Sequence, residues 1–137
     1  MSFANHLLAW GPAVLWAAAL FFLSALPGAV GPDWVNVNDK VAHVGAYAVL
    51  GGTLAWGRHR SATWMDHRWL LVVGALYAVS DEIHQMYVPG RSADPADLLA
   101  DVVGLLLGYG TTWAILGRTK DARDPAGPGA VDDGDTR

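Results

Sequence analysis

The chain has 137 residues, of which 53% are hydrophobic and only 16% are charged. A soluble domain of average composition carries roughly 25% charged residues, so this chain is depleted in charge. Its net charge of −4 argues against nucleic-acid binding, and the absence of cysteine excludes disulfides, thiolate nucleophiles and thiolate metal sites. Length and composition together favour a membrane protein of one domain.

The first apolar stretch, residues 7–26, carries no charge and is long enough to cross a bilayer, for which about 20 residues are needed. A secretory signal peptide is the alternative. No Lys or Arg precedes the stretch, however, and its apolar run exceeds a typical signal core, so we expect a retained helix. Residues 27–38 are rich in Gly, Pro and Asn and predict a loop.

Two further apolar stretches are shorter. Residues 41–56 become long enough to span when Asp39 and Lys40 lie at the membrane interface. Residues 69–79 cannot cross alone. Their helix therefore either continues through the polar segment 80–85 or stops inside the bundle.

The fourth apolar stretch, residues 98–116, is interrupted only by Asp101. Beyond Gly117 the chain turns to Asp, Pro, Gly and Arg, a composition typical of disorder. The sequence therefore predicts an all-α integral membrane bundle of four transmembrane helices in residues 1–117, followed by a disordered acidic tail in residues 118–137.

The positive residues predict the orientation of the bundle. The loop between the second and third helices and the C-terminal flank are rich in Lys and Arg, whereas the other two loops hold only Lys40 and Arg91. Short basic loops stay in the cytoplasm, so we expect both termini there. His59 and His67 of the basic loop should be solvated. The polar residues near the other two loops then gather on the extracytoplasmic side.

Helical spacing aligns polar residues on two of the predicted helices. Asp39, His43 and Tyr47 stand four residues apart and share one face of the second helix. A second stripe on the fourth helix is acidic at its start and contains small residues deeper, which would let another helix approach closely. We expect it to face the bundle, because charges at membrane depth are costly. Its members are Asp94, Asp97, Asp101, Gly104 and Gly108.

These residues belong to four motifs that follow one another along the chain. The motifs are Asp39-Lys40-x-x-His43-x-x-x-Tyr47, Asp81-Glu82-x-His84-Gln85, Val88-Pro89-Gly90-Arg91-Ser92 and Asp97-x-x-x-Asp101-x-x-Gly104-x-x-x-Gly108. In this order they resemble the VanZ-like membrane protein family over about residues 24–110. Many members carry Asn where this chain has Asp101, so a role of that amide is not carried over. The resemblance implies a bacterial inner (cytoplasmic) membrane protein with a link to susceptibility to the lipoglycopeptide teicoplanin, and it defines no reaction.

His43 is a candidate general base. It lies one helical turn from Asp39, which would orient the imidazole as general acid–base sites require. The alternative is that Asp39 caps the helix and pairs with a histidine packed in the bundle. Tyr47 is expected to be a structural hydrogen-bond donor between helices.

Glu82, His84 and Gln85 lie at the end of an apolar stretch that is already too short to cross a bilayer. Polar residues in such a place are expected to have a function. Consecutive residues on a helix diverge by about 100°, so the whole motif cannot face one cavity. We expect Glu82, His84 and Gln85 to point inward and Asp81 to point away.

Arg91 stands alone among acidic residues. Its guanidinium would bind a phosphate or carboxylate of a substrate, or it would neutralise Asp94 or Asp97 and fix the turn; the structural pairing is favoured. Asp94 precedes Pro95 and is expected to cap the fourth helix. Asp97 and Asp101 lie too deep for capping.

From these arguments we expect catalytic roles for His43, Glu82, His84 and Asp101. Substrate binding is expected from Asp39, Lys40, Gln85, Arg91 and Asp97. No cofactor is expected. The alternative is a divalent metal at His43, Glu82, His84 and Asp101, whose ligand types suit Zn²⁺ although no His-x-x-x-His spacing is present.

Three functions remain open at this point. The preferred one is a membrane-embedded acid–base hydrolase or transferase that acts on a lipid or lipid-linked envelope molecule at the outer face. The second is a non-catalytic binder of a lipid, a lipoglycopeptide or a partner membrane protein. The third is a polar cluster that only fixes helix packing.

Overall fold

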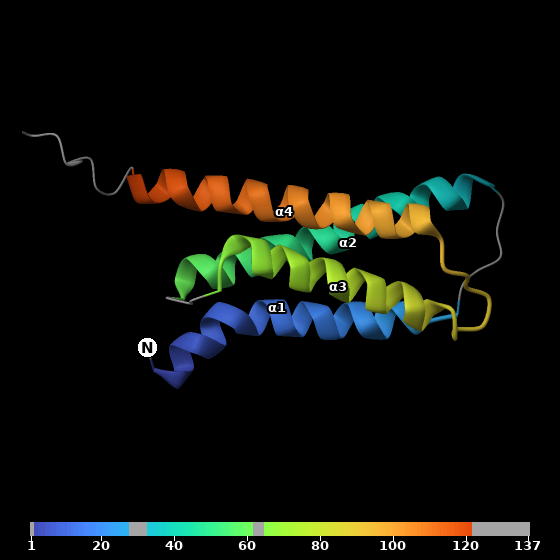
Figure 1. The fold of residues 1–137 in the computed structure, drawn as a ribbon, viewed down its shortest axis with the longest axis horizontal. Helices are drawn as coiled ribbons and strands as arrows, with labels where there is room; N and C mark the ends of the chain where they lie inside the picture. Colours follow the sequence, from blue (N-terminus) through green and yellow to red (C-terminus); the bar gives the residue numbers. More distant parts are fainter. Residues whose placement is uncertain (1, 28–32, 62–64, 122–137) are drawn as a thin grey trace, which may run out of the picture.

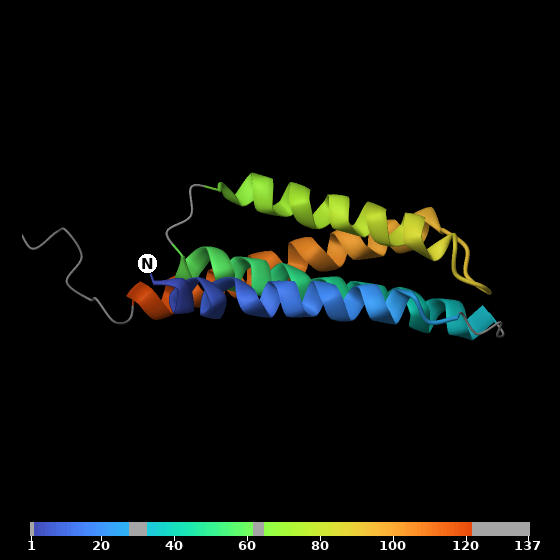
Figure 2. The same cartoon turned by 90° about the horizontal axis from the view of Figure 1, so that it is seen from below.

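The computed structural model describes residues 2–27, 33–61 and 65–121. Within these ranges the chain forms four α-helices and no strand, which confirms the predicted all-α class. The helices lie lengthwise beside one another as a bundle (Figures 1 and 2). They are α1 (Phe3–Ser24), α2 (Asp33–Arg60), α3 (His67–Gln85) and α4 (Pro95–Asp121).

The two ends of the bundle hold different parts of the chain. The N-terminus, the end of α2, the start of α3 and the end of α4 lie at one end, while the α3–α4 connection and the start of α2 lie at the other (Figures 1 and 2). The polar motifs therefore share one end of the bundle. The opposite end carries the basic residues Arg58, Arg60, Arg68 and Arg118.

The helix bounds resolve one expectation and correct two. α3 continues through the polar segment as far as Gln85 instead of stopping before it. The predicted loop to Asn38 is too long, because α2 already begins at Asp33. α4 passes Gly117 and ends at Asp121, since one helical glycine costs only about 1 kcal/mol. The rest of the predicted tail, residues 122–137, lies outside the described residues.

α2 and α4 make the most extensive contact between helices. Gly104 and Gly108 lie against the main chain of Val44 and Ala48, where an added β-carbon would collide with the carbonyl oxygens. The predicted acidic and small-residue stripe of α4 therefore faces α2, and its glycines permit the close approach.

Hydrogen bonds from the side chains of Trp16 and Tyr77 link α1 to its neighbours. The indole Nε1 of Trp16 donates to the carbonyl of Ala46 at 2.8 Å. The hydroxyl of Tyr77 donates to the carbonyl of Ala17 at 2.6 Å and so links α3 to α1. Both aromatic groups satisfy their polar atoms while burying apolar rings between helices.

Two helices are long and apolar enough to cross a membrane, namely α1 and residues Pro95–Thr119 of α4. Large apolar side chains are also exposed on several helices. Leu15 of α1 is 73% exposed, Leu76 of α3 is 62% exposed and Ile115 of α4 is 60% exposed. An outer surface of this kind suits hydrocarbon better than water.

The expectation that His67 is solvated is wrong. Its Nδ1 lies 2.7 Å from the Tyr109 hydroxyl in a hydrogen bond, and its ring packs edge-on against Trp113 at 4.4 Å between centroids. His67 is partly buried, and its side chain contacts Tyr109 and Trp113 of α4. His59 is exposed, as predicted.

Candidate polar site at one end of the bundle

Lys40 joins the start of α4 to α2. Its ammonium lies 2.9 Å from Asp94 Oδ2 and 2.7 Å from Asp97 Oδ1. Asp97 is buried, with 7% of its surface exposed, so this ammonium compensates a carboxylate with little access to solvent. Lys40 and Asp97, both expected to bind substrate, thus hold each other across the α2–α4 contact.

Asp94 caps α4, as predicted. Its Oδ1 accepts a hydrogen bond from the Ala96 N–H at 2.9 Å, and Pro95 begins the helix. The Ala96 N–H, followed by the Lys40 ammonium, holds the pKa of the Asp94 carboxyl below its ordinary value. The α3–α4 connection is therefore tied to α2 through one ionised carboxylate.

His43 pairs with Asp101 and makes no hydrogen bond with Asp39. Its Nδ1 lies 2.8 Å from Asp101 Oδ1, and Asp101 is fully buried. The expectation that Asp39 orients the imidazole is therefore wrong. One helical turn brings Asp39 to the same face of α2 but leaves it exposed, whereas the close approach of α4 brings Asp101 onto the ring.

Asp81 points into the bundle, which corrects the expectation that it points away. It is 6% exposed, and its Oδ2 accepts hydrogen bonds from the Tyr47 hydroxyl and from Gln85 Nε2, both at 3.4 Å. The bond from Tyr47 confirms that this tyrosine is an interhelical donor. Asp81 and Gln85 are one turn apart, so they share the face of α3 that meets α2.

Glu82 is buried as predicted, but it contacts the backbone of the α3–α4 connection. Its Oε2 accepts a hydrogen bond from the Asp94 N–H at 3.1 Å, and 6% of the residue is exposed. His84 differs from the expectation that it points inward. It is only partly buried, and its ring lies 4.6 Å from the ring of Phe21 on α1.

Arg91 pairs with neither Asp94 nor Asp97, so the favoured structural pairing is wrong. Lys40 forms ion pairs with both of these carboxylates instead. The Arg91 guanidinium donates to Gln85 Oε1 at 3.1 Å and to the carbonyl of Leu26 at 3.2 Å. Both partners are neutral, and no ion pair of Arg91 occurs among the described residues, so its positive charge is available to an anion.

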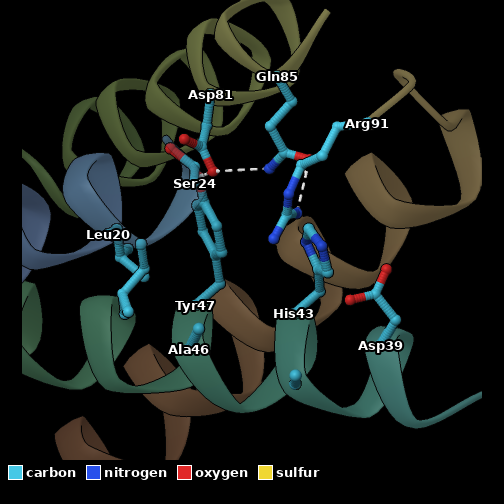
Figure 3. Close-up of a pocket in the computed structure, with 11 residues that line it drawn as sticks. Leu20, Ser24, Asp39, His43, Ala46, Tyr47, Asp81, Gln85 and Arg91 are labelled. Atoms are coloured by element: carbon cyan, nitrogen blue, oxygen red, sulfur yellow. Dashed lines mark hydrogen bonds between the residues drawn. The ribbon is translucent and has the colours of Figure 1, made fainter. Parts of the chain in front are cut away.

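Some of these side chains line a pocket of about 160 Å³ between α1, α2 and α3. Figure 3 shows Arg91, Gln85 and Asp81 on one side and His43, Tyr47 and Asp39 on the other. Ser24 also lines the pocket. Its hydroxyl donates to the Phe21 carbonyl at 3.0 Å near the end of α1. Five of the nine candidate residues thus miss the pocket wall: Lys40, Glu82, His84, Asp97 and Asp101.

Neither Asp81 nor Ser24 was predicted to line this pocket. The signal for Asp81 was its spacing of four residues from Gln85, which places both on one helical face. Ser24 gave no comparable signal, because its position depends on how α1 packs against α3.

Two groups of side chains in the described part of the chain could hold a metal ion. In each group, donor atoms of the members lie within 4.8 Å of one another. One group is Asp39, His43 and Asp97, and the other is His43, Glu82 and Asp101. His84, part of the metal alternative in the sequence analysis, belongs to neither.

The fold and this site define a small all-α protein, with a partly buried network of acids, a histidine and two cations at one end of a helix bundle. Two apolar helices add membrane character. A model of the VanZ/LLP1 family matches residues 13–116, and the chain therefore belongs to this family. The predicted VanZ-like membership is thereby confirmed. No curated protein and no solved structure matches the chain.

Proposed function

We propose that this chain is an inner-membrane protein with four spanning helices whose outward pocket acts on an amphiphilic molecule of the cell envelope. Exposed apolar side chains on α2 and α3 support spanning by these two more polar helices, with Val41 67% exposed and Val73 50% exposed. The 19 residues of α3 extend over roughly 28 Å at 1.5 Å per residue, close to the thickness of a bilayer core.

The distribution of cations supports cytoplasmic termini. The end of the bundle that holds the N-terminus also carries Arg58, Arg60, Arg68 and Arg118, of which the last three are exposed. Basic residues beside spanning helices favour the cytoplasmic side. The end with the polar pocket then faces outward, toward the outer leaflet and the cell wall.

The observation that carries the proposal is the position of an apolar groove beside the polar pocket. A groove of about 360 Å³ lies between the same three helices, lined by Trp10, Val14, Leu50, Leu70, Val73 and Tyr77 among others. Ala17 of the groove and Leu20 of the pocket are one turn apart on α1. The two hollows thus follow one another along the bundle, polar at its outward end and apolar deeper, as a headgroup and its hydrocarbon chain would require.

The polar end suits an anionic headgroup. Arg91 presents a guanidinium held by two neutral acceptors, and such a fork fits phosphate or carboxylate oxygens. Gln85 fixes the guanidinium and is itself held by Asp81. Exposed Asp39 on the opposite wall would accept hydrogen bonds from hydroxyl or amine groups of the same headgroup.

Acid–base chemistry would centre on His43. It lines the pocket, and the buried Asp101 carboxylate fixes its ring through Nδ1. A histidine held in this way exchanges a proton through its other nitrogen while the carboxylate stabilises the charged ring. A hydrolase or transferase acting on a lipid-linked molecule would use His43 as its base, with Asp101 as a positioning residue.

One observation favours a non-catalytic binder as the second candidate. Of the four residues expected to be catalytic, only His43 lines the pocket. Glu82 is turned toward the backbone of Asp94 and offers no acid at the pocket wall. A binder would hold a lipid, a lipoglycopeptide or a segment of a partner membrane protein with the same Arg91 and Gln85 contacts.

Teicoplanin susceptibility of a Gram-positive host, at matched membrane levels, tests the proposal. We expect the wild type to protect and Arg91→Gln to lose protection. Arg118→Gln removes the same charge from the opposite end and should protect fully. Equal protection by both variants would exclude the pocket from the function, and no protection by the wild type would separate this chain from the resistance that the family resemblance implies.

Lipid retained by the purified protein, measured by mass spectrometry, separates catalyst from binder. A catalyst with the His43→Gln change should keep its lipid and lose protection, because binding and proton transfer use different groups. If the protein is a binder, the variant that loses protection should also lose its retained lipid, and this variant should be mainly Arg91→Gln. Retention of the same lipids by wild type and Arg91→Gln would contradict an anionic headgroup site.

A further inference from the structure

Three carboxylates in the polar network are buried and incompletely satisfied. Asp81 and Glu82 are each 6% exposed, and Asp101 is 0% exposed. One oxygen of each lacks a hydrogen-bond partner, namely Asp81 Oδ1, Glu82 Oε1 and Asp101 Oδ2. Orphaned acceptors of this kind are costly in a low-dielectric interior, so each oxygen calls for a hydrogen-bond donor or a cation beside it.

The cations of the described network do not supply that charge. Lys40 is engaged by Asp94 and Asp97. Arg91 contacts the neutral oxygens of Gln85 and Leu26. Among the described residues of this cluster, His43 is the remaining group that could carry a positive charge, and a single imidazolium cannot balance three carboxylates.

We propose that His43, Glu82 and Asp101 bind one divalent cation of the Zn²⁺ class. Their donor atoms lie within 4.8 Å of one another. In a tetrahedral zinc site with bonds of about 2.1 Å the donor atoms lie ~3.4 Å apart, so the side chains must close by roughly an ångström on the ion. One neutral imidazole with two carboxylates is a donor set that zinc accepts, and the two carboxylates cancel the charge of the ion.

Two orphaned oxygens belong to this set, which distinguishes it from a mere acidic cluster. Glu82 uses Oε2 for the Asp94 N–H, and its Oε1 is left over. Asp101 uses Oδ1 for His43, and its Oδ2 is left over. Glu82 and Asp101 can therefore each offer the unbonded oxygen to the ion while the other oxygen stays near its present position.

The alternative group of Asp39, His43 and Asp97 is the poorer site. Asp39 is exposed, where water competes for the ion. Asp97 already holds the Lys40 ammonium at 2.7 Å, and a second cation there would be repelled by Lys40. The deeper group has no such competitor.

The ion would lie behind the wall of the polar pocket. His43 belongs both to the wall and to the ligand set, whereas Glu82 and Asp101 do not line the pocket. Three protein ligands leave a coordination position for water or a ligand oxygen, as in catalytic zinc sites. With the ion bound, His43 would serve as a ligand and no longer as a free base, and a water in that position would take over the role of base. The proposal does not depend on the amphiphile, since it concerns the binding of the metal alone.

Metal content and zinc titration of the detergent-purified full chain, carrying an affinity tag without histidine, test the site. After chelation and dialysis, we expect the wild type to bind one Zn²⁺ per chain by calorimetry and elemental analysis and to unfold at a higher temperature with the ion than without it. Glu82→Gln and Asp101→Asn should weaken binding more than about tenfold, because loss of a direct ligand exceeds the effect of an outer-shell partner. Asp39→Asn should bind as the wild type does.

Several results would overturn the site. One is a wild type that takes up no Zn²⁺ at unit stoichiometry, a result that requires no variant to fold. Another is Zn²⁺ binding lost in Asp39→Asn and kept in Glu82→Gln, which would move the ion to the outer group. A third is a chain that gains thermal stability from Glu82→Gln and Asp101→Asn and does not respond to Zn²⁺, which would show that protons balance these carboxylates. Mn²⁺ and Mg²⁺ titrations in parallel rank the ions.

Discussion

The main chain of Gly108 lies against the carbonyl of Ala48 with no room for a β-carbon between them. Gly104 repeats this relationship one turn earlier against Val44, so two turns of α4 rest on α2 backbone to backbone. The acidic residues of the same stripe are thereby brought within reach of Lys40 and His43. The geometry of the polar site is thus set by glycines deeper in the bundle.

Gly108→Ala should destabilise the protein although alanine is the better helix former. The methyl group must separate α2 from α4, at a cost of about 1–3 kcal/mol for overpacking. Gly110→Ala on the same helix is the control, since an added Cβ there meets nothing within 4 Å. Thermal unfolding in detergent should show a lower midpoint for the first variant only. Equal midpoints would contradict the close approach of the two helices.

Lys40→Met should lower the unfolding temperature because it strips the buried Asp97 carboxylate of its counter-ion. The double variant Lys40→Met/Asp97→Asn should recover part of the loss, since it removes the unpaired charge as well. Comparison of both single variants with the double variant gives the coupling between the two residues. Strictly additive effects would mean that the ion pair contributes nothing to the fold.

Asp94 should make a pH-dependent contribution to stability. Its pKa in the folded protein is lowered by the Ala96 N–H and then by Lys40. The contribution is therefore complete above the unfolded value of about 4 and is lost as the pH falls through the lower folded value. Asp94→Asn keeps a capping side chain but loses the charge. Its unfolding midpoint should fall below that of the wild type at pH 7 and converge with it in acid; a constant difference would rule out titration of Asp94 as the cause.

Tyr77→Phe should cost about 0.5–1.5 kcal/mol, the usual net value of one hydrogen bond, because its hydroxyl links α3 to the Ala17 carbonyl of α1. Tyr87→Phe provides the matched control at a side chain that is 83% exposed. Chemical unfolding of both variants in the same detergent compares the two. No difference between them would mean that the α1–α3 link adds no stability.

His84→Ala should leave protection against teicoplanin intact, whereas His43→Ala should abolish it. The two histidines differ in position: His43 lines the pocket, while His84 packs against Phe21 at the side of the bundle. Susceptibility at equal membrane abundance measures the effect. Loss of protection by His84→Ala alone would place the functional surface on the α1–α3 face outside the pocket.

Local patterns were sufficient to predict the four helices and the inner faces of α2 and α4. Long apolar runs predicted α1 and α4, and the four-residue spacing of Asp39, His43 and Tyr47 predicted the inner face of α2. The Asp94–Pro95 pair predicted the start of α4. Each of these features depends on residues within one or two turns of one another.

Partners on different helices could not be predicted in the same way. Asp39 is the carboxylate nearest to His43 in sequence, yet Asp101, 58 positions away, is the one bonded to it. Both Lys40 and Arg91 could have paired with Asp94 on sequence grounds. The register of α2 against α4 places Lys40 beside it. That register depends on glycine contacts whose partner residues cannot be read from one helix.

The apolar groove is open at its sides: Val14 is 69% exposed and Val73 is 50% exposed. In a bilayer, a hydrocarbon chain entering there would leave one hydrocarbon medium for another, so its transfer free energy would be close to zero. Selectivity would then arise almost wholly at Arg91 and Gln85, and lengthening the acyl chain would change affinity little. A water-soluble carrier with the same groove would show the opposite dependence, gaining roughly 0.8 kcal/mol for each methylene buried.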